Sequence, residues 1–358
     1  MDRRAVLGGM GGAGLMSLAG CAAGLSASTA KFASEIDMDG APGLSLGVVR
    51  KGRILALGGK GRRGPTDAVV PGADTIFEIG SLTKTFTASL IFELEVEGRL
   101  ETTAPVGRYL SDLPEAWRSV RLEHLLSHTS GIPEYLDADN FRDLMPRDLA
   151  PHDLIAIAAV KPMTDEPGAR HAYNNTGYVL LGLVAEAVTG GRSYWDQVED
   201  RFFKPAGMER TGPRPRIPGD ADRAGGRFWD GSYWAPNPPA SAPGSTFSAG
   251  GLCSTARDLC RWAQALDHHR ILSKAIRERM WRPATLNDGS PAGWGYGWMV
   301  EDSDGNRIVS HGGGTAGFSC WFRRDLNREL TTIVLTNQNG RADPLEMTHQ
   351  LVARAIGA

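Results

Sequence analysis

Residues 76–96 of this 358-residue chain read IFEIGSLTKTFTASLIFELEV, and this stretch marks a change from strand to buried helix. Its first four residues are strand-like, and a glycine follows them at the point where a turn is needed. Large apolar residues then recur every fourth position from Leu82 to Leu94, and Gly98 is a typical helix stop. Because other apolar residues fill a second side of this helix, we expect it to be buried on several sides. Because strand-like residues precede it, we also expect it to begin directly after a strand.

Strand-like segments occupy both ends of the chain. Near the start, residues 44–49 and 53–58 flank a short Lys-Gly turn, which is a hairpin pattern. Near the end, four apolar segments separated by turn signals precede a helical pattern over residues 344–356. These four segments are residues 294–300, 307–311, 317–323 and 330–337. Further helical patterns over residues 178–188 and 254–266 lie between the two groups of strands.

This order of elements predicts an α+β fold. Strands from both chain ends would form one antiparallel sheet flanked by helices, over residues 39–100 and 285–358. A mostly helical region, residues 101–284, would be inserted between them. Strands and helices do not alternate one by one, which argues against a parallel sheet of βαβ units.

The composition is that of a globular protein and excludes several classes. Lys and Arg total 39 and Asp and Glu total 41, a net charge of −2, and 41% of the residues are hydrophobic. These values exclude a disordered chain, and the lack of a dense basic stripe argues against a nucleic-acid partner. No phosphate loop or dinucleotide fingerprint occurs in its required context, so we expect no cofactor. His124 and His128 are four residues apart, but Leu125 stands where a zinc protease needs glutamate, so we also expect no metal.

Residues 1–20 have the pattern of an export signal. Arg3 and Arg4 give it a positive start and resemble a twin-arginine signal. The uncharged stretch that follows is too short and too rich in glycine for a membrane span. We therefore expect a signal peptide and an exported, periplasmic protein.

Residues 18–21 read LAGC and resemble a bacterial lipobox, in which Cys21 carries the lipid. The alternative is a plain secretory signal cut near Ala30. With the lipobox, residues 21–38 would be a flexible tether and residues 39–358 the folded domain. The membrane contact would then be a lipid anchor alone, in the outer membrane.

The first chemical motif is Gly80-Ser81-Leu82-Thr83-Lys84, at the start of the buried helix. A lysine three residues after a serine lies on the same helix face, one turn along. A desolvated lysine can lose its proton and accept one from the serine hydroxyl. The alternative is a serine that caps the helix beside an exposed lysine, and the same spacing recurs at Ser28 and Lys31.

The second motif is Tyr173-Asn174-Asn175, just before a helical pattern. A tyrosine hydroxyl beside an amine can relay a proton, and an asparagine amide can both donate and accept hydrogen bonds. The alternative is that one of the two asparagines caps the helix and the tyrosine is part of the core.

The third motif is His311-Gly312-Gly313-Gly314, which we place at the end of a strand. The glycines would let a substrate lie along the backbone and let N–H groups face an oxyanion. A plain strand-end turn is one alternative. An α/β-hydrolase oxyanion loop is another, but its Gly-x-Ser-x-Gly elbow should follow the loop, and the only match, residues 43–47, lies far upstream in a hairpin.

Together these motifs, in this order and spacing, resemble the class C β-lactamase-like family of penicillin-recognising serine hydrolases. That family also contains DD-peptidases, D-aminopeptidases and esterases, and its three-motif pattern is well known. Further similar stretches are LLSHTSGIP at residues 125–133, FKPAGMERT at 203–211 and GGLCSTARDL at 250–259. The resemblance covers residues 41–358 and implies a β-lactamase/DD-peptidase-like fold.

The resemblance also implies roles for individual residues. Ser81 would be the acylated nucleophile, Lys84 would activate it, and Tyr173 would pass a proton to the leaving group. Asn175 would orient the substrate and Lys84. The N–H groups of Ser81 and Gly314 would form the oxyanion hole, with Gly313 in the same strand.

The third motif departs from the family's Lys-Thr-Gly, because His311 and Gly312 stand at the first two positions. The family's lysine and threonine help to bind a substrate carboxylate. We therefore expect a serine hydrolase for small-molecule esters, amides or D-amino-acid peptides. A β-lactamase or a DD-carboxypeptidase of the cell envelope, acting on β-lactams or peptidoglycan peptides, is the alternative. A non-catalytic penicillin-recognising module is a further one.

Overall fold

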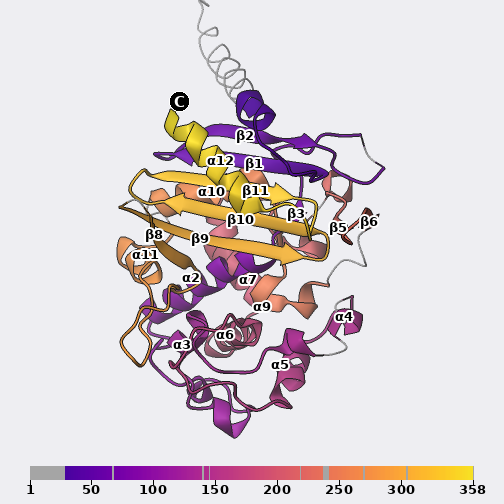
Figure 1. The fold of residues 1–358 in the computed structure, drawn as a ribbon. Coiled ribbons are helices and arrows are strands. Elements are labelled where there is room, and N and C mark those ends of the chain that lie inside the picture. The colour runs from indigo at the N-terminus through magenta and orange to yellow at the C-terminus, as the bar shows by residue number, and fades with distance from the viewer. Residues whose placement is uncertain are drawn as a thin grey trace, which may run out of the picture.

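A six-stranded antiparallel sheet forms the upper part of the protein in the computed structural model (Figure 1). The structure describes residues 29–357 except 67, 139–140, 145, 218, 237–241, 269–270 and 304. The strand order is β2-β1-β11-β10-β9-β8. The strands are β1 (Gly43–Arg50), β2 (Arg53–Gly61), β8 (Met299–Ser303), β9 (Asn306–Thr315), β10 (Phe318–Asp325) and β11 (Leu330–Thr336).

Strands from the two chain ends meet in the middle of this sheet. β1 pairs antiparallel with β11, with Leu46 opposite Val334. The side chains of β11 alternate between the two faces of the sheet. Val334 packs in an apolar cluster on one face, and Ile333 and Leu335 pack in the larger core on the other face. The predicted α+β fold is confirmed, with the sheet closed by the two chain ends.

The outer face of the sheet is covered by α12 (Pro344–Gly357) and by a helical segment at residues 29–34 (Figure 1). Phe32 and Ile36 are buried in one cluster with Leu351 of α12. Residues 29–38 were expected to belong to a flexible tether, and here the structure differs. Their apolar side chains cover sheet surface that would otherwise face water. The remainder of that tether, the signal peptide and Cys21 lie outside the described residues.

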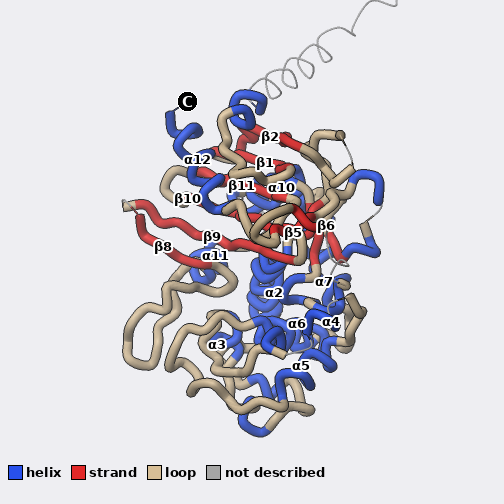
Figure 2. Tube along the Cα trace, turned by 45° about the vertical axis from the view of Figure 1, so that its right-hand side comes forward, coloured by secondary structure: helices blue, strands red, loops and turns tan. Residues whose placement is uncertain are grey.

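The other face of the sheet packs on α10 (Ala256–Asp267), and α2 (Thr83–Val96) belongs to the same apolar core. Figure 2 shows α2 running from the sheet down into the helical region. Eleven of the fourteen residues of α2 are buried, as its two apolar sides predict. The helix therefore carries its N-terminus to the boundary between the two parts of the molecule.

The regular elements of the inserted region are mostly helices, with short strands at its border with the sheet. Its helices are α3 (Leu122–Leu126), α4 (Phe141–Leu144), α5 (Pro151–Ala159), α6 (Asn175–Val188), α7 (Tyr194–Val198), α8 (Lys204–Ala206), α9 (Phe247–Gly250) and α11 (Lys274–Met280). The short strands are β3 (Phe77–Glu78), β4 (Gly212–Pro213), β5 (Arg227–Trp229), β6 (Trp234–Pro236) and β7 (Leu252–Ser254). α6 packs against α2 and α9, and this contact brings distant parts of the chain together at the site.

One expected strand, residues 294–300, is mostly irregular. β8 begins only at Met299, and Gly293 and Gly297 have φ of +68° and +80°, which a strand does not accommodate. Trp298 is buried in the core although it does not lie in a strand. Its apolar side chain therefore does not indicate the alternation of a strand. Residues 285–298 therefore belong to a loop region rather than to the sheet.

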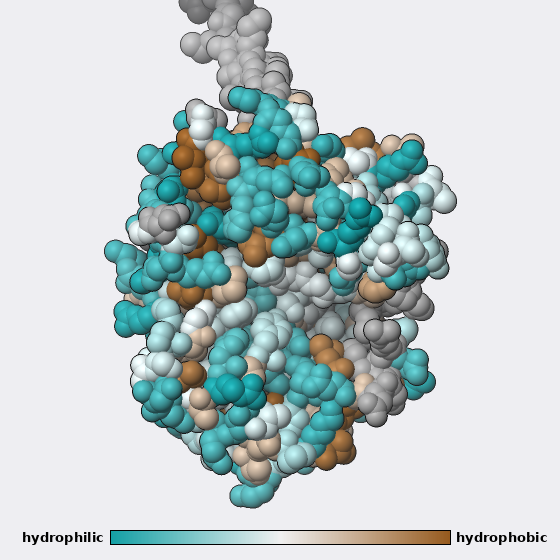
Figure 3. Space-filling model, in the orientation of Figure 1, coloured by the Kyte–Doolittle hydropathy of each residue, from teal (hydrophilic) through white to brown (hydrophobic). Residues whose placement is uncertain are grey.

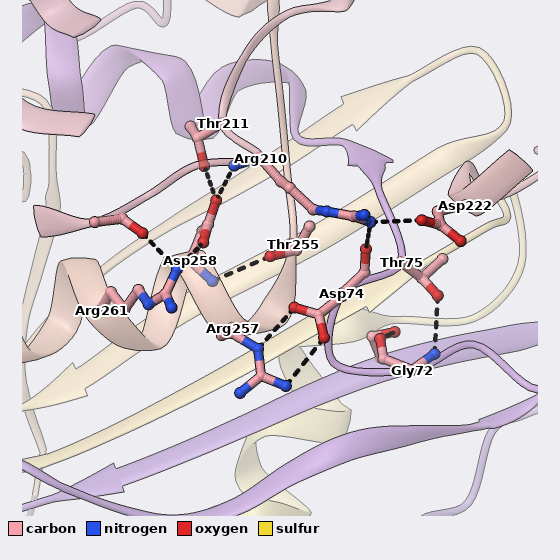
Figure 4. A network of polar contacts seen from close by, with 12 residues as sticks. Gly72, Asp74, Thr75, Arg210, Thr211, Asp222, Thr255, Arg257, Asp258 and Arg261 are labelled. Atoms are coloured by element: carbon pink, nitrogen blue, oxygen red, sulfur yellow. Dashed lines mark hydrogen bonds and ion pairs between the residues drawn. The ribbon is translucent and has the colours of Figure 1, made fainter. Parts of the chain in front are cut away.

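A polar network ties α10 to two loops near β3 (Figure 4). Asp258 on α10 accepts hydrogen bonds from the backbone N–H of Arg210 at 2.8 Å and from Thr211 Oγ1 at 3.0 Å. The Arg210 guanidinium in turn donates to the backbone carbonyl of Asp74 and to the carboxylate of Asp222. Arg257 pairs with Asp74 through two hydrogen bonds of 2.7 and 3.0 Å. The network holds the chain just before β3 in place.

The molecular face in Figure 3 is mostly polar, with apolar side chains in small separate groups. Of the helices described, none combines the length and apolar character that crossing a membrane requires. Cys253, Cys260 and Cys320 are buried free thiols. Within the described ranges, His, Cys, Asp and Glu nowhere form a group of three or more that could hold a metal ion.

Candidate active site

Ser81 lies in a short helical turn, residues Gly80–Leu82, between β3 and α2. Gly80 has φ +46°, and a Cβ atom there would come within 2.6 Å of the Gly314 carbonyl oxygen. Glycine therefore lets this turn pack directly against β9. The Ser81 side chain makes no helix-capping hydrogen bond, and Lys84 is fully buried. The interpretation of Ser81 as a cap beside an exposed lysine is therefore wrong.

Lys84 points into the site and has three partners. Its Nζ donates to Asn175 Oδ1 and to the Ala249 backbone carbonyl, each at 2.7 Å, and lies 3.1 Å from Ser81 Oγ. Burial lowers the pKa of Lys84 to about 7, and the charge of Glu134 opposes this shift. A large fraction of the amine is therefore neutral near neutral pH.

Tyr173 lies beside the same pair. Its hydroxyl hydrogen-bonds the Ser81 side chain, and Lys84 Nζ lies 4.9 Å from the centre of its ring. The ring stacks on His128 with centroids 4.2 Å apart. Although 39% of the surface of Tyr173 is exposed, its hydroxyl group is buried, and this burial raises the pKa of Tyr173. The hydrogen bond with Ser81 opposes the rise. The phenol therefore keeps its proton at neutral pH.

The two asparagines of the second motif have different partners. Asn174 caps α6, because its Oδ1 accepts from the Gly177 backbone N–H at 2.7 Å. Asn175, the first residue of the helix, turns its side chain to Lys84. The capping interpretation therefore applies to Asn174, whereas the side chain of Asn175 contacts Lys84.

His311 is buried within β9, not at the end of a strand as expected. Its Nδ1 lies 2.6 Å from the Gly312 carbonyl oxygen, which can only accept, so Nδ1 carries the hydrogen. Burial, with Lys84 nearby, lowers the pKa of His311 to about 3, so the ring is neutral. Its Nε2 is then a bare acceptor, and it has no hydrogen-bond partner among the described residues.

The glycines of the third motif allow β9 to approach the Ser81 turn. The pairing of β8 with β9 extends to Ser310, opposite Met299, and the following part of β9 lies against the turn. A Cβ atom at Gly313 would come within 1.9 Å of the Ile79 carbonyl oxygen. At Gly312 it would meet the Trp321 ring at 2.4 Å, so the threonine of the related motif does not fit there. At Gly314 the nearest atom would be 3.9 Å away.

The structure brings Ser81, Lys84, Tyr173 and Asn175 into direct contact, with His311 and the two glycines on the adjoining strand. Sequence reasoning missed Glu134, whose carboxylate accepts from Asn175. The only signal for it was its position directly after the LLSHTSGIP stretch. It also missed the Ala249 carbonyl, which has no side-chain signal.

Comparisons with known proteins identify the family of the chain. The family model described as Beta-lactamase matches residues 29–356. The chain is 33% identical over 282 residues to Penicillin-binding protein 4* of Bacillus subtilis, covering 74% of this chain and 61% of that protein. It is 26% identical over 303 residues to D-aminopeptidase of Brucella abortus, covering 84% of this chain and 57% of that protein. The chain thus spans about three fifths of the length of these curated relatives.

Solved structures share the fold over most of the chain. The octameric penicillin-binding protein homologue from Pyrococcus abyssi aligns with a TM-score of 0.78 and 27% identity, covering 94% of this chain and 77% of that one. The D-stereospecific amidohydrolase from Streptomyces sp. aligns with a TM-score of 0.74 and 27% identity, covering 92% and 97%. By its fold and by the match along nearly its whole length, the chain belongs to the Beta-lactamase family.

Proposed function

We propose that this member of a family of serine hydrolases cleaves amides or esters through an acyl-enzyme on Ser81, with Lys84 as the base. The observation that carries the proposal is the set of partners around the buried amine. A neutral amine has two N–H bonds and one lone pair. Asn175 Oδ1 and the Ala249 carbonyl, both at 2.7 Å, accept the two hydrogens. The lone pair then faces Ser81 Oγ, 3.1 Å away, and can take its proton.

Acylation follows from these positions. The Ser81 Oγ proton passes to Lys84 Nζ while Oγ bonds to the substrate carbonyl carbon, whose oxygen becomes an oxyanion. The backbone N–H groups of Ser81 and Gly314 stabilise that charge. The bond to the leaving amine or alcohol then breaks. Tyr173 gives the leaving group its proton and regains one from Lys84, so both residues return to their starting state.

Deacylation uses the same groups. A water molecule adds to the acyl carbon, and its proton passes through Tyr173 to Lys84. The bond between the acyl carbon and Ser81 Oγ breaks, and Oγ recovers a proton from Lys84. The product acid leaves with the enzyme unchanged.

His311 supports a preference for substrates without a carboxylate at this position. A carboxylate has only acceptor atoms and cannot hydrogen-bond to the bare Nε2 of a neutral histidine. Losing one charged contact costs about 1.5–3 kcal/mol, roughly a tenfold to hundredfold loss of affinity. The names of two relatives, D-aminopeptidase and D-stereospecific amidohydrolase, support D-amino-acid amides as the substrate class.

The second candidate is a penicillin-reactive enzyme of the cell envelope, which the similarity to Penicillin-binding protein 4* favours. Intact-mass analysis and turnover assays with benzylpenicillin, a short-chain nitrophenyl ester and D-alanine amide separate the two. We expect turnover of the ester and the amide and at most slow acylation by benzylpenicillin. Fast penicillin turnover would favour the second candidate instead. Ester turnover that survives Ser81→Ala would show that the nucleophile is a different residue.

A further inference from the structure

We propose that Glu134 is a positioning residue of this site, which holds the Asn175 side chain so that its oxygen faces Lys84 and keeps the lone pair of that amine directed at Ser81. This inference rests on the proposed function. It concerns a residue outside the three motifs, contributed by the segment between α3 and α4.

The carboxylate of Glu134 accepts two hydrogen bonds from Asn175. Its Oε2 accepts from the Asn175 backbone N–H at 2.5 Å and from Asn175 Nδ2 at 3.1 Å. Its Oε1 accepts from the Leu136 backbone N–H at 3.0 Å, which fixes the carboxylate itself. The side chain of Asn175 is thus held from the end opposite to Lys84.

These hydrogen bonds decide which end of the Asn175 side-chain amide faces the amine of Lys84. An ionised carboxylate only accepts hydrogen bonds, so the NH₂ group of Asn175 must face Glu134 and its oxygen must face Lys84. A reversed amide would point an N–H donor at the amine. That donor would take the lone pair which the Ser81 proton needs. Glu134 therefore excludes the orientation in which Lys84 cannot act as a base.

The charge of Glu134 acts on Lys84 as well. The other titratable groups facing the amine are Tyr173, Tyr178, His128 and His311. Burial raises the pKa of both tyrosines and lowers the pKa of both histidines, so these four are neutral near pH 7. Among the described residues Glu134 is the charged group acting on the pKa of Lys84, and it raises that pKa against the effect of burial. The same burial raises the pKa of Glu134, an effect that its hydrogen bonds and Lys84 oppose.

Two variants separate orientation from charge. Glu134→Gln keeps an oxygen that can accept from Asn175 but removes the charge. Its kcat/KM profile for the nitrophenyl ester should keep its shape while the acid limb moves to lower pH by about one unit or more. Glu134→Ala also removes the hydrogen bonds that hold Asn175, so kcat should fall by up to about a hundredfold with KM little changed. Part of that loss should be recovered in Glu134→Gln.

Glu186→Gln is the matched control. Glu186 is also a partly buried glutamate that accepts a backbone N–H bond, from Tyr194, but it lies near the other end of α6. The acid limb of the kcat/KM profile of Glu186→Gln should lie at the same pH as that of the parent protein. The inference is wrong if the limb of folded Glu134→Gln does not move and Glu134→Ala keeps the parent kcat. If the parent protein itself is not acylated at Ser81, the proposed function fails instead, and intact mass distinguishes the two results.

Discussion

At the scale of single residues, the surroundings of Lys84 set the pH at which the site can work. Burial lowers its pKa to about 7, so the amine gains its neutral, reactive form as the pH rises through that value. About one molecule in ten is reactive at pH 6 and about nine in ten at pH 8. We therefore expect kcat/KM for the ester to rise through this range and then level off. A profile that is flat from about pH 5.5 to 8.5 would contradict Lys84 as the base.

His311 gives a second test at this scale, because the proposed substrate preference depends on its neutral ring. His311→Lys would place a cation where the bare Nε2 lies now. Acylation by benzylpenicillin, followed by time-resolved intact mass, should become about tenfold to hundredfold faster. His311→Gln, which stays neutral, should show no such gain. An equal response of the two variants would mean that charge at this position does not select the substrate.

The residues that sequence reasoning brought forward were those with distinctive chemistry in short motifs. Ser81 and Lys84 are one helical turn apart, so a local pattern places them together. Glu134 reaches Asn175, and the Ala249 carbonyl reaches Lys84, from separate segments, and the packing of α6 and α9 against α2 creates these contacts. No local pattern reports such an encounter. A backbone carbonyl in particular leaves no mark on the residue type.

At the scale of elements, the contact between β9 and the turn before α2 positions the two N–H groups that we propose as the oxyanion hole. Gly313→Ala would place a methyl group within 1.9 Å of the Ile79 carbonyl oxygen, so β9 must move away from the turn. We expect a loss of about 1–3 kcal/mol in the free energy of unfolding. We also expect kcat to fall by about a hundredfold, because an oxyanion donor is displaced.

Gly314→Ala is the control for stability, since its methyl group would meet its nearest atom at 3.9 Å. Thermal unfolding should show a clearly lower Tm for Gly313→Ala than for Gly314→Ala. Equal Tm values and a parent-like kcat in Gly313→Ala would show that β9 and the Ser81 turn are not tightly apposed.

The elements also show where sequence patterns succeed and fail. The strands β1, β2, β10 and β11 were predicted within a few residues, because hairpin signals and apolar segments mark them. The start of β8 was not, since the apolar residues Trp294 and Trp298, which alternate with glycines, imitate a strand. β9 runs on through its glycines to Thr315, although glycine disfavours strands, because β10 pairs with it along that stretch.

At the scale of the whole molecule, the segment before β1 is part of the fold. Phe32 is 6% exposed and packs in the cluster between the sheet and α12. Phe32→Ala should lower the free energy of unfolding by about 3 kcal/mol or more, measured by denaturant unfolding. The exposed Lys31→Ala next to it should change it by less than about 0.5 kcal/mol. Similar stability of Phe32→Ala and the parent would return this segment to the status of a tether.

This packing also bears on how the protein is processed, for which we propose lipidation at Cys21. Thr29 is part of the fold, because its hydroxyl accepts from the Leu57 backbone N–H at 2.8 Å and donates to the Leu57 carbonyl at 3.2 Å. A secretory cut near Ala30 would remove this contact, whereas processing before Cys21 would keep it.

Seven residues, 22–28, separate Cys21 from Thr29, so the two residues are eight steps apart and at most about 29 Å from each other. A lipid on Cys21 would therefore hold the sheet close to the membrane surface. Cys21→Ala should move the protein from the membrane fraction to the soluble periplasmic fraction with the catalytic domain still folded. The mature N-terminus, read by mass spectrometry, decides between the two cuts, because an unmodified terminus near residue 31 would contradict the lipid anchor.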